Sequence, residues 1–178
     1  ILEGVDVLAD NVASTLGPRG RNVILHKRGK NPIITKDGVT VARFVSLDDP
    51  FENLGVQVVK QASSQTNNDA GDGTTTATVL SRAILTEAQK YLSAGVSPSE
   101  LKKGIDKAVE VVCQNLEEQA RPIMSVEDIT HIATISANND ESIGKLVAMA
   151  VDKVGKDGAI TIEEARSVET SLDIIEGF

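Results

Sequence analysis

Apolar residues recur three to four positions apart in the first part of this chain, which is the spacing of one face of a helix. The first such stripe ends at a Gly/Pro-rich break at 15–20 and comprises Ile1, Val5, Leu8, Val12 and Leu16. A second helix is predicted from Pro50, because Asp49 is an N-cap residue type and Glu52 completes a capping-box pattern. Its apolar face carries Leu54, Val58 and Ala62.

Two more helices follow in the pattern. One has Gly95 as its terminator and carries the stripe Ala77, Leu80, Ile84, Ala88 and Tyr91. The next begins at the capping box SPSE, 97–100, and carries Leu101, Ile105, Ala108, Val112 and Leu116. Between the first two helices, β-branched runs at 22–27, 32–35 and 39–45 are separated by Gly- and Asn-containing turns. These runs predict a small hairpin region of three strands.

The pattern changes near Pro122, where we place a domain boundary between 1–121 and 122–178. A short helix is predicted at 126–134, and a longer one carries Ile143, Leu146, Ala150 and Val154. Strands are predicted at 159–164 and 171–177. The expected fold is therefore mainly α with small β elements, and its second part is α+β.

The amino-acid composition limits the kinds of function that this chain can have. The 178 residues suffice for one domain, or for one domain and part of another. Aromatic residues are only 2% of the chain and its formal net charge is −8, which argues against a nucleic-acid partner. No apolar run approaches transmembrane length, so no membrane partner is expected. The single Cys113 cannot form an internal disulfide, which favours a reducing compartment.

The stretch AGDGTTTATVL, 70–80, has the most distinctive chemistry. Its glycines let the backbone approach a ligand, and the N–H groups of the helix that follows favour an anion such as phosphate. Asp72 would repel that phosphate unless a cation lay between them, and Mg²⁺ is the cation that bridges carboxylates and phosphates. The alternative is a tight turn in which Asp72 or Thr74 is merely the N-cap. No Gly-Lys-Ser/Thr follows a glycine loop, which disfavours a P-loop ATPase.

Two other segments have matching chemistry. TLGPRG, 15–20, ends a helix with a hydroxyl and a proline-stiffened turn. TKDG, 35–38, offers Lys36 to a phosphate and Asp37 to orient water or to help hold a metal. Each one alone is better explained as an ordinary turn. The three together predict a divided nucleotide site.

Seven segments of this chain resemble those of GroEL-type group I chaperonins in order and spacing. They cover nearly the whole sequence and are TLGPRGRNV, TKDGVTVA, FENLG, AGDGTTTATVL, KKGIDKAV, TISANNDE and VGKDGAITIEE. The GRNV after the proline is similar to the bacterial and organellar group. The resemblance implies that 1–121 is the N-terminal part of an equatorial, ATP-binding domain. It implies that 122–178 is the first part of an intermediate domain, ending where an apical domain, absent from this sequence, would start.

The resemblance also implies the site residues and the cofactors ATP and Mg²⁺. Nucleotide contacts would come from Thr15, Leu16, Gly17, Pro18 and Lys36. The phosphates would be held by Asp72, Gly73, Thr74, Thr75 and Thr76. Asp72 would also bind the metal, and Asp37 would lie near the γ-phosphate and assist hydrolysis.

The function that the resemblance implies is that of an ATP-dependent chaperonin subunit, of which this chain is a fragment. Hydrolysis would drive the folding of unfolded polypeptides in a homo-oligomeric cage, built from seven-membered rings when full length. A co-chaperonin and the polypeptides would bind the absent apical domain. The location would be the bacterial cytoplasm or an organelle such as the mitochondrial matrix. The alternative is a non-catalytic structural or interaction fragment.

Overall fold

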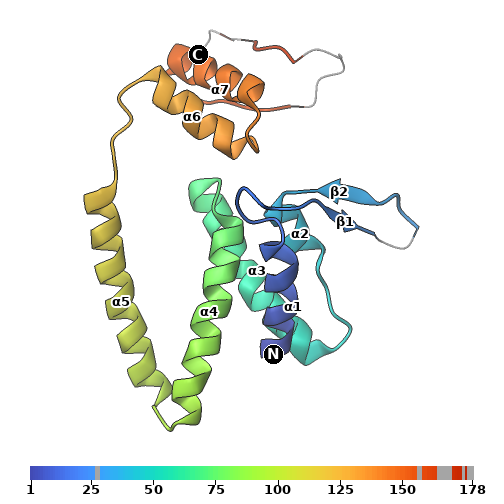
Figure 1. The fold of residues 1–178 in the computed structure, drawn as a ribbon, viewed down its shortest axis with the longest axis vertical. Coiled ribbons are helices and arrows are strands. Elements are labelled where there is room, and N and C mark those ends of the chain that lie inside the picture. Colours follow the sequence, from blue (N-terminus) through green and yellow to red (C-terminus); the bar gives the residue numbers. More distant parts are fainter. Residues whose placement is uncertain (27–28, 156–157, 164–169, 174, 176–178) are drawn as a thin grey trace. The chain divides into compact units, whose positions relative to one another are not determined.

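The computed structural model describes the chain except for 27–28, 156–157, 164–169, 174 and 176–178. The described residues form seven helices and two strands (Figure 1). In chain order these are α1 (Leu2–Ala13), β1 (Val23–Leu25), β2 (Ile33–Thr35), α2 (Gly38–Phe44), α3 (Pro50–Ala70), α4 (Thr74–Ser93), α5 (Pro98–Gln119), α6 (Val126–Ser136) and α7 (Glu141–Val154). The mainly helical fold predicted from the sequence is confirmed.

The chain divides into two compact units, Ile1–Cys113 and Gln114–Phe178. Helix α5 is continuous across this division and ends at Gln119, and residues 120–124 form neither helix nor strand. The domain boundary that we place near residue 121 remains a prediction. No helix within the described residues is both long enough and apolar enough to cross a membrane.

The core of the first unit lies where α1, α3 and α4 pack against one another. The predicted stripe of α1 supplies Val5, Leu8 and Val12, each at most 1% exposed. Around them lie buried residues of β1, α2 and α3: Leu25, Val41, Ala42, Val56 and Val59. The buried core is thus aliphatic, and Phe44 is among the partly buried residues packed against it.

Helices α1 and α3 approach each other through glycine. A Cβ at Gly55 would lie 2.2 Å from the carbonyl oxygen of Ile1, so no larger residue fits at this crossing. Helix α3 buries Gly55 together with Val56, Val59 and Ser63. The apolar face predicted for this helix is therefore at the surface, with Leu54 51% and Val58 54% exposed.

The β region contains two strands and a helix. Strands β1 and β2 pair antiparallel, as in the predicted hairpin, and Val23 lies opposite Thr35. The predicted third strand is wrong, because residues 38–44 form α2. The Asp37 side chain caps this helix, and Val41 and Ala42 bury its inner face in the core. The cap and the burial in the core together outweigh the preference of the β-branched residues for a strand.

A lysine of α3 holds the other end of α2. Lys60 Nζ donates to the carbonyl oxygens of Arg43, at 3.1 Å, and of Val45. These bonds satisfy carbonyls that have no partner within the helix. Partial burial beside them lowers the pKa of Lys60 through desolvation.

In the second unit, α6 and α7 pack together. A Cβ at Gly144 of α7 would lie 2.1 Å from Thr134 Oγ1 of α6, which shows how closely the helices approach. The strands predicted at 159–164 and 171–177 are not formed in their described residues. A strand needs a hydrogen-bonded neighbour, and the described part of the chain pairs no strand with these segments. The other residues of those predictions lie outside the described ranges.

Candidate functional site

The three segments singled out in the sequence meet at Gly38, the first residue of α2. A Cβ built on Gly38 would lie 2.1 Å from Thr75 Oγ1 and 3.6 Å from Thr15 Oγ1. Thr15 follows α1, and Thr75 lies in the first turn of α4. The turn after α1, the start of α2 and the start of α4 are therefore in contact, although they are far apart in the sequence.

The segment after α1 is a compact turn. Thr15 is 7% exposed, and its Oγ1 donates to the carbonyl oxygen of Val12 at 2.7 Å. The backbone then folds back, because Arg21 N donates to the Ser14 carbonyl at 2.8 Å. Gly17 makes this possible with a φ of 69°. The exposed tip of the turn consists of Leu16, Gly17 and Pro18.

The start of α4 lacks a side-chain cap. Gly71 and Gly73 have φ of 72° and 84°, and Gly73 is the N-cap residue of α4. The N-cap side chains of α2, α3, α6 and α7 each accept a backbone N–H, but Gly73 has no side chain to do so. Within the described part of the chain, the N-cap residue of α4 thus supplies no acceptor to the first-turn N–H groups, the kind of group that binds anions at helix starts.

The N-cap residue of α4 is Gly73, and not Asp72 or Thr74 as in the alternative interpretation. The Asp72 Oδ1 atom accepts from the Gly73 N–H at 2.6 Å, one residue before the helix begins. The Asp72 side chain is exposed beside that start. Thr74 lies within the first turn of the helix.

The three threonines of this stretch have different surroundings. Thr74 is 6% exposed, and its carbonyl oxygen accepts from Thr78 Oγ1 at 2.9 Å and from Ser63 Oγ of α3 at 3.4 Å. Thr75 is half-buried and contacts Gly38, whereas Thr76 is exposed. The first turn of α4 therefore contacts both α2 and α3, and Thr76 remains at the surface.

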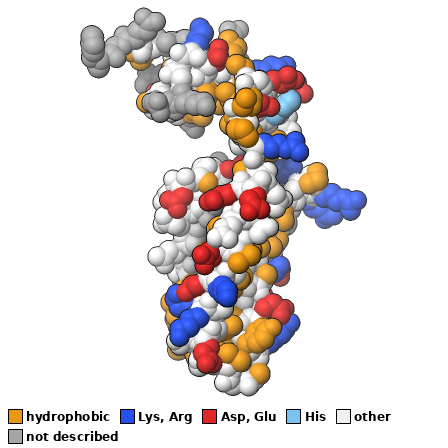
Figure 2. All heavy atoms as spheres, turned by 90° about the vertical axis from the view of Figure 1, so that its left-hand side faces the viewer, with side chains coloured by type: hydrophobic (Ala, Val, Ile, Leu, Met, Phe, Trp, Pro, Cys, Tyr) orange, Lys and Arg blue, Asp and Glu red, His pale blue; other side chains and the backbone are white. Residues whose placement is uncertain are grey.

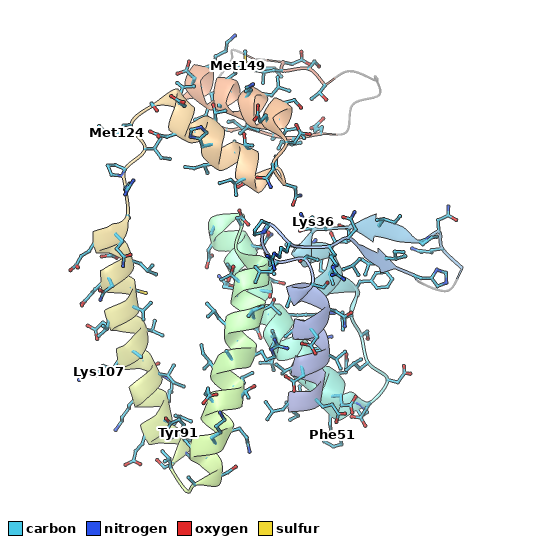
Figure 3. All side chains as sticks on the ribbon, in the orientation of Figure 1. Lys36, Phe51, Tyr91, Lys107, Met124 and Met149 are labelled. Atoms are coloured by element: carbon cyan, nitrogen blue, oxygen red, sulfur yellow. The ribbon has the colours of Figure 1, made fainter. Side chains whose placement is uncertain are left out.

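Lys36 and Asp37 directly follow β2, and Asp37 is the N-cap residue of α2. Lys36 is half-buried, and Figure 3 shows it at the end of the first unit where α1 ends and α4 begins. The Asp37 N–H donates to Thr35 Oγ1 at 3.0 Å. The Asp37 Oδ1 atom accepts from Val39 N at 3.2 Å, and Oδ2 accepts from Thr40 N at 2.9 Å and Thr40 Oγ1 at 2.5 Å.

Sequence reasoning did not select Gly38 or Thr40 as site residues. Aspartate is one of the favoured N-cap residue types, because its side chain accepts the N–H groups of the first turn, as Asp37 does here. That cap was readable in the sequence, but the prediction of a strand at 39–45 concealed it. The contact of Gly38 with Thr75 could not be read from either segment alone.

The residues fit a phosphate better than a free metal ion. N–H groups of α4, threonine hydroxyls and Lys36 are donors suited to phosphate oxygens. No cluster of three or more metal-binding side chains occurs in the described residues. A Mg²⁺ ion at Asp72 would therefore take its remaining ligands from phosphate oxygens and water, which is its usual arrangement in nucleotide sites.

Comparisons with known proteins agree on one family. The model of the TCP-1/cpn60 chaperonin family matches residues 8–177. The solved structure of a group III chaperonin in the open state is 27% identical over 85% of this chain and 30% of its own, with a TM-score of 0.70. The chaperonin gp146 from bacteriophage EL 2 (Pseudomonas aeruginosa), crystallised with ATP-BeFx, is 31% identical over 88% of this chain and 28% of its own, with a TM-score of 0.69. The chain thus spans less than a third of each of these proteins.

Proposed function

This chain belongs to the TCP-1/cpn60 chaperonin family, and we propose that its first unit binds the phosphates of Mg-ATP. The observation that carries the proposal is the contact of Gly38 with Thr75 and Thr15, beside the uncapped start of α4. That contact joins the three segments whose chemistry predicts a divided nucleotide site. The presence of ATP-BeFx with the phage chaperonin supports the same ligand class.

Each group has a role that follows from its chemistry. The first-turn N–H groups of α4 and the Thr76 hydroxyl donate to phosphate oxygens, and Lys36 adds a positive charge. Asp72 supplies a carboxylate to Mg²⁺, and the turn at 15–18 contacts the rest of the nucleotide. Bound Mg²⁺ would neutralise the phosphates and polarise the terminal phosphoryl group. The Asp37 carboxylate orients the attacking water and accepts its proton.

The wider function is that of a group I chaperonin subunit, which the GRNV segment favours over the other groups. Such a subunit would hydrolyse ATP and enclose unfolded polypeptides in a cage of seven-membered rings, closed by a co-chaperonin. The bacterial cytoplasm or an organelle matrix is the expected location. Since the chain spans less than a third of the solved chaperonins, we expect little or no hydrolysis by this chain alone.

Calorimetric titration of the chain with ATP, with and without Mg²⁺, tests the proposal. We expect Mg²⁺-dependent binding that Asp72→Ala weakens by about 10-fold or more, as for loss of other groups at metal sites. Asp69→Ala is the matched control, because Asp69 is also exposed but accepts from Gln65 of its own helix. Absence of Mg²⁺-dependent heat would favour the non-catalytic fragment, and equal losses in both variants would contradict the role of Asp72.

A further inference from the structure

The Thr40 side chain contacts the carboxylate that the proposed function places in catalysis. Thr40 Oγ1 donates to Asp37 Oδ2 at 2.5 Å, and Thr40 N donates to the same oxygen at 2.9 Å. Thr40 is the only residue within the described ranges for which two hydrogen bonds to Asp37 are seen. Its hydroxyl is not needed to cap α2, because the N–H groups of residues 39 and 40 already receive that cap.

The two carboxylate oxygens of Asp37 accept different numbers of hydrogen bonds. Each carboxylate oxygen has about two acceptor positions. Both positions on Oδ2 are occupied by Thr40, whereas Oδ1 accepts one longer bond, 3.2 Å, from Val39 N. Among the described residues, a second donor to Oδ1 is not found, so one acceptor position remains on it, and the bonds to Oδ2 determine which way Oδ1 points.

The helix that carries Thr40 is itself held in place. Val41 and Ala42 are 0% and 3% exposed in the core, and Gly38 contacts Thr75 of α4. Lys60 bonds the far end of α2. The Thr40 hydroxyl is thus fixed relative to the start of α4, where the phosphates would lie.

We propose that Thr40 is a positioning residue, which holds Asp37 Oδ2 so that Oδ1 faces the water that attacks the terminal phosphate. The proposal rests on the proposed function of Asp37. In the step itself, the water oxygen bonds to the phosphorus, the bond from phosphorus to the leaving diphosphate oxygen breaks, and the water proton passes to Asp37 Oδ1. Thr40 transfers no proton and contacts no substrate.

The test uses the full-length ATPase subunit and separates turnover from binding. Thr40→Val removes the hydroxyl and keeps the branched shape, and Thr40→Ser keeps the hydroxyl. We expect Thr40→Val to lower kcat by about 10-fold to about 100-fold, the range for loss of orienting groups. The nucleotide Kd should stay within about two-fold of wild type, because Thr40 does not touch the phosphates. Thr40→Ser should retain most of kcat.

A wild-type kcat in Thr40→Val, or an equal loss of kcat in Thr40→Ser, would overturn the proposal. If Thr40→Val does not fold, Thr40→Ala and Thr40→Ser are compared, since they differ only by the hydroxyl oxygen. Asp37→Asn separates this proposal from the proposed function. A wild-type kcat in Asp37→Asn contradicts the role of Asp37 itself. A loss in Asp37→Asn with none in the Thr40 variants contradicts only the role of Thr40.

Discussion

At Gly38 the absence of a side chain determines how closely α2 approaches α4. The space where a Cβ would lie is filled by the Thr75 hydroxyl, 2.1 Å away. This distance is far below a normal contact, so alanine here must displace Thr75 or move the helix. Gly38 is buried and helical, so its backbone conformation does not require glycine. The close contact with Thr75 explains why this residue has no side chain.

Gly38→Ala is expected to lower the free energy of unfolding by about 1 to 2 kcal/mol. Overpacking costs about 1 to 3 kcal/mol, and the better helix propensity of alanine offsets part of it. Gly104→Ala in α5 is the matched control, because no atom lies within 4 Å of its Cβ position apart from its chain neighbours and the backbone of its own helix. The free energy of unfolding of that variant should rise by about 0.5 to 1 kcal/mol. Urea unfolding of both variants measures the difference, and changes of the same sign would contradict the contact at Gly38.

At the scale of elements, capping residues were better predictors than apolar stripes. Asp49 caps α3 and Ser97 Oγ accepts from the Glu100 N–H at the start of α5, both as predicted. Caps depend on neighbours in the sequence, so the sequence shows them. Which face of a helix is buried depends on distant residues. The sequence therefore did not reveal which face of α3 is buried, or that Val41 and Ala42 are buried in the core, although the Asp37 cap of α2 was readable.

The caps of α6 and α7 are expected to make the stability of the second unit depend on pH under acid conditions. Hydrogen bonds from Met124 N and the Ser125 hydroxyl lower the pKa of Asp128. The Ser142 hydroxyl and the Ile143 N–H likewise lower the pKa of Asp140. A carboxylate with a lowered pKa stabilises the fold fully above its unfolded-state pKa. This stabilisation is lost as the pH falls through the folded-state pKa.

Asp128→Asn should therefore weaken the loss of stability on acidification. The free energy of unfolding of the variant, measured by urea titration from pH 7 to about pH 2, should fall less steeply than that of wild type below about pH 4. Glu127→Gln is the control, since Glu127 lies in the same first turn but is not the capping-box residue. Its curve should follow wild type more closely. Identical acid curves for wild type and Asp128→Asn would show that this cap is not linked to pH.

At the scale of the whole molecule, every predicted site residue lies in the first unit, Ile1–Cys113. The chemistry of each segment was readable in the sequence, but their contact through Gly38 was not, because it depends on the packing of α1, α2 and α4. Exposed apolar side chains lie on the long helices, including Leu80 and Ile84 of α4 and Val112 and Leu116 of α5. Figure 2 shows hydrophobic side chains among both signs of charge on the face where α5 lies in front. Both helices form as predicted, but these residues of their apolar stripes are exposed among the described residues.

The proposed nucleotide site lies within the first unit, which predicts how nucleotide affects the stability of each unit. A ligand that binds only the folded state stabilises it by about 2.7 kcal/mol at a free concentration 100 times its Kd. Amide hydrogen exchange should therefore slow by up to about 100-fold in α1 to α4 when Mg-ATP is added, if those amides exchange through opening of the site. Exchange in α6 and α7 should not change, and ATP with EDTA should protect neither unit. Equal protection of both units would contradict a site formed by the first unit alone, because nucleotide would then be stabilising residues that the proposed contacts do not include.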